Sequence, residues 1–147
     1  ALQRLLDTFH LAGLPAAASA DIRSDLWDKL LGNVVLNPLS ASTGRDLAAL
    51  LDDPETHARI TAGMQEARAV ADSFGISPGR AIAERLERSA AIARRGRFRT
   101  SMLQDRQAGK PLELEPIVGA VIELARLNAI ATPTLDRLYA EARAISP

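Results

Sequence analysis

Apolar residues recur every three or four positions along almost the whole chain, a spacing that places them on one side of an α-helix. No segment keeps the two-residue alternation that is typical of a half-buried strand. The pattern therefore predicts an all-α fold, a multi-helix bundle in one domain. Gly, Pro and capping residues divide it into helices over residues 2–12, 21–43, 45–51, 54–74, 77–95, 101–107, 115–127 and 135–145.

The segment from Asp21 to Thr43 has the most unusual pattern. Leu, Val and Trp residues surround most of its circumference, which predicts a helix that is buried on nearly all sides. Lys29, Asn33 and Asn37 follow one another at four-residue steps, and because an α-helix turns by about 100° per residue they share one face. Polar groups on a buried face need hydrogen-bond or ion-pair partners. This polar face is therefore the first candidate for a binding site.

Two interpretations of the polar face are open. In the first, a polar ligand satisfies all three side chains. In the second, Asp25 pairs with Lys29 four residues later, and the two asparagine amides bond to backbone groups or water inside the core. Pro38 removes an intrahelical hydrogen bond and, together with Gly32, predicts a kinked or interrupted helix. A kink at this point would direct Asn37 into a cleft.

The amino-acid composition argues against several classes of function. Lys plus Arg and Asp plus Glu each number 18, so the formal net charge is zero, without the basic excess expected for a nucleic-acid or membrane partner. The chain has no cysteine, which excludes thiolate chemistry and is compatible with a cytoplasmic protein. No apolar run is long enough to span a membrane. His10 and His57 lie far apart without metal-ligand spacing, so no metal site is expected.

The chain lacks the motifs of a nucleotide-binding domain. It contains neither G-x-G-x-x-G after a strand nor a Walker-type phosphate loop, and no change of composition marks a second domain. It begins with Ala1 inside a helical pattern and without a signal peptide. We therefore expect residues 1–147 to be one helical domain, and the chain to be a fragment of a longer protein.

Two short motifs have both a functional and a structural interpretation. Gly75–Gly79 reads G-x-S-x-G, but a nucleophile elbow needs a strand-to-helix turn and an N–H after the serine, which Pro78 lacks. We therefore expect Ser77 to cap the next helix, with Pro78 at its first position. The arginine-rich run Arg94–Arg99 fits a solvated loop, or alternatively a site for a phosphate or carboxylate.

Two further positions lie at predicted helix starts. Ser101 with Gln104 three residues later matches a capping box; the alternative is that Ser101 and the helix N-terminus bind an anion. Glu113 shortly precedes the helix that begins near Glu115, where acidic residues suit the helix dipole. Spacing favours the structural interpretation at both positions.

An ordered set of residues runs through the chain: Trp27, Lys29, Asn33, Asn37–Pro38, Ser101–Asp105, Gly109, Glu113, Gly119 and Thr132–Pro133. This set resembles the C-terminal domain of the ketopantoate reductase family, over nearly the whole chain. Members of that family reduce 2-dehydropantoate to pantoate with NADPH. They combine an N-terminal Rossmann domain with a helical C-terminal domain similar to that of 6-phosphogluconate dehydrogenases.

The resemblance implies a role for each candidate residue. Lys29 corresponds to the catalytic lysine, the proton donor, and Asn33, Asn37 and Ser101 correspond to substrate contacts. Glu113 corresponds to a cofactor-binding residue that lies near both cofactor and substrate at the cleft between the domains. The resemblance also implies a small 2-keto acid substrate and an NADPH cofactor held mainly by a Rossmann domain that this chain does not contain. On its own, the chain is then expected to be inactive.

The chemistry agrees with the spacing. When hydride reaches a ketone carbon, negative charge develops on the oxygen, and an ammonium group in a partly desolvated cleft can stabilise that charge and deliver a proton.

The main alternative function is a non-catalytic helical dimerisation or interaction module that keeps the motif by descent. A homodimer is expected, because the absence of the Rossmann domain should expose the apolar surface that faces the cleft, and exposed apolar patches commonly pair.

Overall fold

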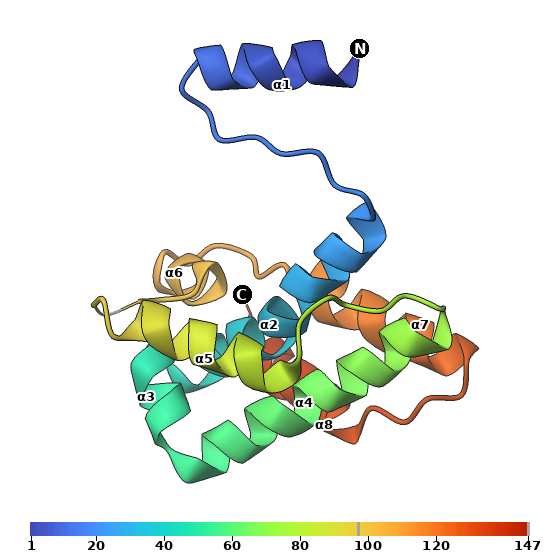
Figure 1. The fold of residues 1–147 in the computed structure, drawn as a ribbon. Coiled ribbons are helices and arrows are strands. Elements are labelled where there is room, and N and C mark those ends of the chain that lie inside the picture. The colour runs from blue at the N-terminus through green and yellow to red at the C-terminus, as the bar shows by residue number, and fades with distance from the viewer. Residues whose placement is uncertain (97, 147) are drawn as a thin grey trace.

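The computed structural model describes residues 1–96 and 98–146, and every regular element in these ranges is helical (Figure 1). This confirms the all-α prediction. No helix of the described residues is both long and apolar enough to cross a bilayer. The elements are α1 (Leu2–Leu11), α2 (Ile22–Thr43), α3 (Leu47–Asp52), α4 (Pro54–Ser73), α5 (Ile82–Ala93), α6 (Ser101–Gln107), the π-helical turn η1 (Glu115–Gly119), α7 (Ala120–Leu127) and α8 (Pro133–Arg143).

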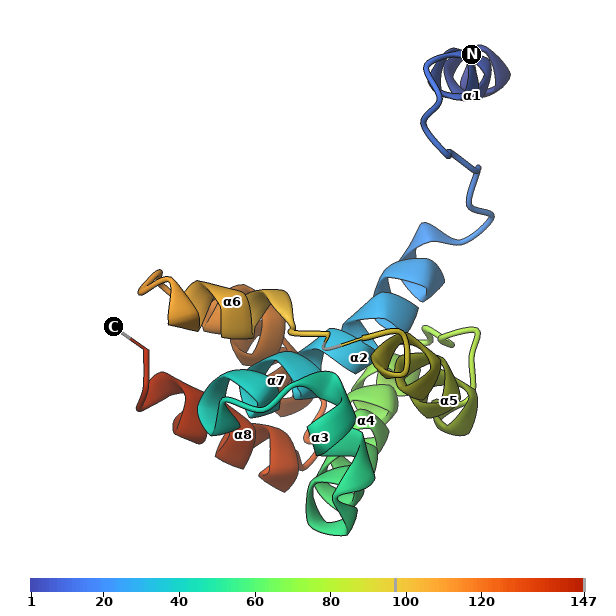
Figure 2. The same ribbon diagram turned by 90° about the vertical axis from the view of Figure 1, so that its left-hand side faces the viewer.

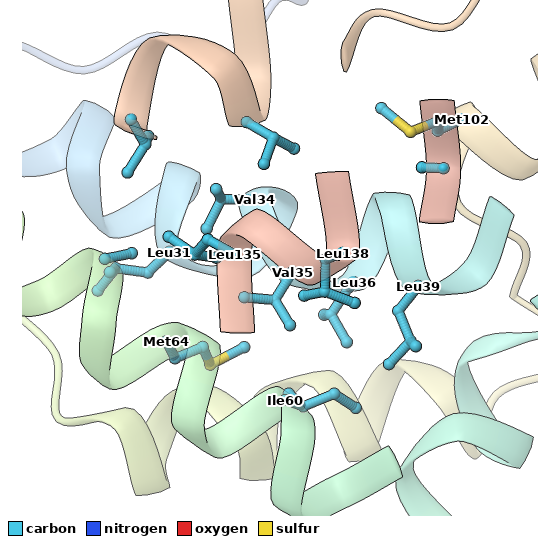
Figure 3. Close-up of a cluster of buried hydrophobic side chains, with 14 of the residues drawn as sticks. Leu31, Val34, Val35, Leu36, Leu39, Ile60, Met64, Met102, Leu135 and Leu138 are labelled. Atoms are coloured by element: carbon cyan, nitrogen blue, oxygen red, sulfur yellow. The ribbon is translucent and has the colours of Figure 1, made fainter. Parts of the chain in front are cut away.

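Helix α2 is the centre of the fold. It packs against α4, α6 and α8, and its leucine and valine side chains lie among the isoleucine and methionine side chains of α4 and the leucines of α8 (Figure 3). Each fully buried aliphatic side chain contributes about 1.5–3 kcal/mol by leaving water, so this contact is the main stabilising element of the domain. Its buried side chains include Leu31, Val34, Val35 and Leu39 of α2, Ile60 and Met64 of α4, and Leu135 and Leu138 of α8.

A glycine sets the close approach of α4 to α2. A Cβ atom at Gly63 would lie 2.8 Å from Cγ2 of Val35, a separation that real side chains do not adopt. Val35 is fully buried and has a stiff, β-branched side chain, so it cannot easily move away. The absence of a side chain at Gly63 therefore allows the two helices to pack this closely.

Helix α1 stands apart from the rest of the molecule. It is joined to α2 by residues 12–21, which contain no helix, and both views show it away from the other helices (Figures 1 and 2). None of its residues is buried, and Leu2, Leu5 and Phe9 are exposed on it. The first helix therefore contributes nothing to the core around α2.

Of the two forms predicted for the central helix at Pro38, a kink or an interruption, the interruption is wrong. Helix α2 continues through Pro38 to Thr43, and Pro38 is itself buried. Packing against three neighbouring helices stabilises the helix enough to tolerate the missing hydrogen bond at this position. The expected burial also holds only from Trp27 onward, because the first turns of α2 extend beyond the bundle and Leu26 is 58% exposed.

Two other helix starts differ from the predictions. Helix α5 begins at Ile82 after Ala81, so Ser77 is not its cap; instead, the carbonyl of Ser77 accepts a hydrogen bond of 2.6 Å from the Ser24 hydroxyl. Helix α3 begins at Leu47, later than expected, because the Asp46 carboxylate caps it by accepting a hydrogen bond from the backbone N–H of residue 49. The ends of the remaining helices agree with the predicted segments to within about two residues.

Candidate functional site

A cleft of about 710 Å³ lies between α2, α5 and the start of α6. Lys29, Asn33 and Asn37 line it from α2, and Ser101 lines it from the first position of α6. The fold therefore brings two segments that are more than sixty residues apart in the sequence to the same cleft. Four of the five residues singled out by the sequence analysis meet in this cleft.

The polar face of α2 passes from the protein surface into the interior. Lys29 is exposed, Asn33 is half-buried, and Asn37 is only 6% exposed. Within residues 1–96 and 98–146, none of these three side chains has a hydrogen-bond or ion-pair partner. A buried amide without a protein partner is normally satisfied by water or a ligand. The three groups are therefore available to a molecule that enters the cleft.

The ion pair considered as an alternative does not form. The carboxylate of Asp25 accepts a hydrogen bond of 2.6 Å from the Ser19 hydroxyl, and it makes no ion pair with Lys29 among the residues described. The asparagine amides likewise make no hydrogen bond to the described backbone. The geometry thus favours the ligand interpretation of the polar face over the structural one.

The predicted capping box at the start of α6 is wrong. The cap is Thr100, whose Oγ1 accepts a hydrogen bond of 3.2 Å from the N–H of Leu103. The Gln104 amide donates to the carbonyl of Arg99 at 2.9 Å and does not return to the cap. Because the neighbouring threonine caps the helix, Ser101 keeps an exposed side chain at the wall of the cleft.

The remaining sequence candidates lie partly or wholly outside the cleft. Glu113 is exposed in the loop between α6 and η1 and does not line it, so its contact with a cofactor stays a prediction. From the arginine-rich run, Arg99 lines the cleft, whereas Arg94 and Arg95 are exposed outside it. Arg97 lies outside the described residues.

A buried carboxylate beside the lysine escaped the sequence analysis. Asp28 is only 5% exposed, and its Oδ2 accepts hydrogen bonds from Nη1 of Arg80 and, at 3.3 Å, from Nη1 of Arg85. Nη2 of Arg85 also donates to the carbonyl of Lys29 at 2.9 Å. The signal that could have revealed this cluster is the position of Asp28 on a helix predicted to be buried, since a buried carboxylate needs cationic partners.

A second glycine makes room for this cluster. A Cβ atom at Gly32 would lie 3.2 Å from Nε of Arg85, tighter than most side-chain contacts. The guanidinium group of Arg85 therefore lies directly across the backbone of α2. Burial lowers the pKa of Arg85, and the positive charges of Arg80 and Arg88 lower it further, while the Asp28 carboxylate raises it.

The cleft carries a local excess of positive charge, although the chain as a whole is neutral. Five cationic side chains line it against two carboxylates, those of Asp25 and Asp28. A concave site lined with one sign of charge concentrates ligands of the opposite sign. The arrangement suits an anionic small molecule. The cationic residues are Lys29, Arg80, Arg85, Arg88 and Arg99.

The chain spans about half the length of the relatives that it matches in sequence and structure. A 2-dehydropantoate 2-reductase of Mesorhizobium japonicum is 41% identical over 135 residues, which span 92% of this chain and 40% of the relative. The crystal structure of a 2-dehydropantoate 2-reductase from Methylococcus capsulatus superimposes with a TM-score of 0.87 at 31% identity, covering 98% of this chain and 49% of that one.

A third relative is a structure of a dimeric ketopantoate reductase from Staphylococcus aureus, with a TM-score of 0.78 and 27% identity, covering 99% of this chain and 51% of that one. The family described as ketopantoate reductase PanE/ApbA C terminal matches residues 21–146. That match begins at the cap of α2 and includes the whole cleft. The chain therefore belongs to the ketopantoate reductase C-terminal domain family.

Proposed function

We propose that this chain is the helical substrate-binding domain of an NADPH-dependent 2-keto acid reductase, and that 2-dehydropantoate is the first substrate to test. In this proposal an N-terminal Rossmann domain supplies the nucleotide site. The observation that carries the proposal is the set of three polar side chains, Lys29, Asn33 and Asn37, which face one cleft without any partner among the described residues. The substrate named for the relatives, 2-dehydropantoate, is a small anion, which suits the positive charge of the cleft.

Lys29 acts as the proton donor in this proposal. Bound NADPH would supply the hydride to the carbonyl carbon of the substrate. The ammonium group of Lys29 stabilises the negative charge that develops on the carbonyl oxygen and transfers a proton to it. Its exposed position at the cleft lets it exchange protons with solvent after each turnover, while Arg85 holds its backbone carbonyl in place.

The neutral polar groups orient the substrate. The Asn33 and Asn37 amides donate hydrogen bonds to its oxygen atoms without adding a titrating charge. The hydroxyl of Ser101, on the α6 side, donates to its carboxylate. Glu113 is the one residue of this chain proposed to contact the cofactor, from the exposed loop between α6 and η1. The described residues contain no glycine-rich phosphate loop, so the phosphates of the nucleotide are held elsewhere.

We also propose that the protein forms a homodimer, as the Staphylococcus aureus relative does. Exposed apolar side chains of α2 and of the ends of α4 and α7 offer a surface for it: Leu26, Phe74 and Leu127. Light scattering on the full-length protein measures the mass directly. A monomer at high concentration contradicts this part of the proposal.

Steady-state kinetics of the full-length protein tests the proposed activity. We expect NADPH-dependent reduction of 2-dehydropantoate or a related 2-keto acid, monitored by loss of nicotinamide absorbance. The isolated chain serves as a matched control and should bind NADPH weakly or not at all by calorimetry. Absence of turnover with every 2-keto acid would favour the alternative function, a non-catalytic dimerisation module.

A further inference from the structure

The wall of the cleft formed by α5 is joined to α2 at the proposed proton donor. Nη2 of Arg85, on α5, donates a hydrogen bond of 2.9 Å to the backbone carbonyl of Lys29. Nη1 of the same arginine donates to Oδ2 of Asp28 at 3.3 Å. One guanidinium group therefore holds two consecutive residues of α2. The planar fork of arginine can serve two acceptors in this way, whereas a lysine ammonium group is a single point charge.

Helix α5 has little apolar attachment to the bundle. Ala93, its last residue, is the only buried one in Ile82–Ala93, all of which the structure describes. Ile82 and Leu86 are half-buried against the core. A helix that buries so few side chains gains little from the hydrophobic effect, so polar contacts have a larger share in fixing its position. The bonds that Arg85 makes to α2 are contacts of this kind.

The ion pair of Arg85 with Asp28 is a poor stabiliser of the fold. Both side chains are largely buried, at 15% and 7% exposure. Nε of Arg85 and Oδ1 of Asp28 are also buried, and neither has a hydrogen-bond partner among the described residues. Removing two charges from water costs free energy, which their attraction returns in full only when the remaining polar atoms are paired as well. The contribution of this pair therefore lies in the geometry that it fixes.

The absence of a side chain at Gly32 gives Arg85 its place beside this turn of α2. A Cβ atom at position 32 would lie 3.2 Å from Nε and 3.3 Å from Nη2 of Arg85. Glycine inside a helix lowers helix stability relative to alanine, and here the close approach of the guanidinium group explains it. Gly32 follows Lys29 by about one helical turn. Arg85 therefore passes directly across the turn that carries the lysine.

We propose that Arg85, anchored by Asp28, is a positioning residue for Lys29: it fixes the α5 wall against the lysine-bearing turn of α2 and so sets the geometry in which the ammonium group meets the keto oxygen. This inference rests on the proposed function, in which Lys29 is the proton donor. The asparagine amides that bind the substrate stay in place without Arg85. Its loss therefore lowers kcat and leaves the KM for the 2-keto acid nearly unchanged.

The test is a double-mutant cycle in the full-length protein, with steady-state reduction of 2-dehydropantoate as the readout. Arg85→Met keeps a long apolar side chain but removes the fork, and it should lower kcat by about 10- to 100-fold, the scale of a misplacement of about 1 Å at a catalytic group. In a Lys29→Ala background the same change should lower the residual kcat by less than about twofold, because a residue that acts through Lys29 has no effect once the lysine is gone. Two effects that multiply in full overturn the inference.

A conservative variant separates geometry from charge. Arg85→Lys keeps the positive charge, but its ammonium group cannot reproduce the fork between Asp28 and Lys29, so it should recover only a small part of the lost kcat. Full recovery overturns the inference, because charge alone would then account for the effect.

Arg59→Met is the matched control for general destabilisation. Arg59 is also largely buried, and it pairs with Glu141 at 2.6 Å between α4 and α8, outside the cleft. Its replacement should leave kcat unchanged, even where thermal melts show a lower melting temperature. A loss of kcat as large as that in Arg85→Met would show that the effect follows stability, and the inference is then overturned.

Hydrogen exchange separates this inference from the proposed activity, because it measures the anchoring without turnover. In Arg85→Met the backbone amides of α5 should exchange faster than in wild type, and those of α8, which packs on the other side of α2, should not change. Unchanged exchange in α5 overturns the inference whatever the activity. Faster exchange in α5 of a protein that reduces no 2-keto acid supports the anchoring at Lys29, and only the proposed activity then fails.

Discussion

The two sides of α2 differ in character: one is packed into the core, and the other borders the cleft. The side facing α4 and α8 is apolar and closely packed, with Val35 against Gly63. The side facing α5 and the start of α6 carries two asparagine amides without a partner among the described residues, a buried carboxylate and excess positive charge. Large apolar side chains fill the first side, whereas the second encloses a cleft of about 710 Å³.

The cleft side of α2 is expected to lower the stability of the domain, and the packed side is expected to raise it. Buried polar groups without partners, and like charges gathered together, destabilise a folded chain. On α2 they are confined to one side, and the apolar contacts of the other side offset them. We therefore expect substitutions on the cleft side to change activity more than stability, and substitutions on the packed side to do the reverse.

The largest expected effect is at Lys29. If Lys29 is the proposed proton donor, Lys29→Ala in the full-length protein should lower kcat by about 10²- to 10⁴-fold, the usual scale of general acid catalysis, because the developing oxygen charge would lose its proton source. Lys29→Arg should restore little, since a guanidinium group does not release its proton near neutral pH. Steady-state kinetics measures both. Near-normal turnover in Lys29→Ala would show that the lysine has only a structural role.

The asparagines should affect binding more than turnover. Asn33→Ala and Asn37→Ala should each weaken the 2-keto acid by about 1–3 kcal/mol, the cost of an unmet hydrogen bond, with a much smaller effect on NADPH. Asn128→Ala is the matched control, since Asn128 donates to Ser73 away from the cleft. Equal changes in KM for substrate and nucleotide would contradict a role in substrate binding.

On the packed side, Gly63→Ala should destabilise the fold by about 1 kcal/mol. Overpacking against Val35 costs about 1–3 kcal/mol, and the better helix propensity of alanine offsets up to about 1 kcal/mol of it. Chemical unfolding of the isolated chain measures this. Gly79→Ala is the control, because a Cβ atom there meets nothing within 4 Å. A Gly63→Ala variant as stable as wild type would show that the α2–α4 contact can relax.

The smallest expected effect lies away from both sides of α2, at Asp53. Hydrogen bonding to Arg45, and then to the backbone N–H groups of Glu55 and Thr56, lowers the pKa of Asp53 below its ordinary value of 3.8. The ionised form therefore stabilises the folded state above about pH 4, and this contribution is lost as the pH falls through the folded-state pKa. Asp53→Asn should melt slightly earlier than wild type at pH 7, and the difference should shrink as the pH is lowered from about 4 through the folded-state pKa. A difference that does not change as the pH is lowered would contradict this origin.

Local patterns predicted the helices and the polar face of α2, because both depend on spacing within one segment. The four-residue steps of Lys29, Asn33 and Asn37 are a property of any α-helix, and the structure places all three in one cleft. Small local differences were harder to predict. Thr100 and Ser101 are adjacent and both suit a cap, and only the backbone of the folded chain determines which one caps α6.

Contacts between distant segments could not be read from spacing. Arg80 and Arg85 reach Asp28 across more than fifty residues of sequence, and no local pattern connects them. The zero net charge of the chain also gave no sign of the positive cleft, because an average over all residues hides a local excess. Helix α2 continues through Pro38 for a similar reason, since its stability comes from the helices packed around it.

The contact of Arg85 with Asp28 across Gly32 has a consequence for how this domain can change in evolution. Loss of the carboxylate alone would leave two guanidinium groups facing each other, and loss of Arg85 would leave Asp28 with fewer cations. A side chain at position 32 would displace Arg85 from its place across α2. Positions 28, 32, 80 and 85 should therefore vary together among relatives, so that members with a different residue at one of them also differ at the others.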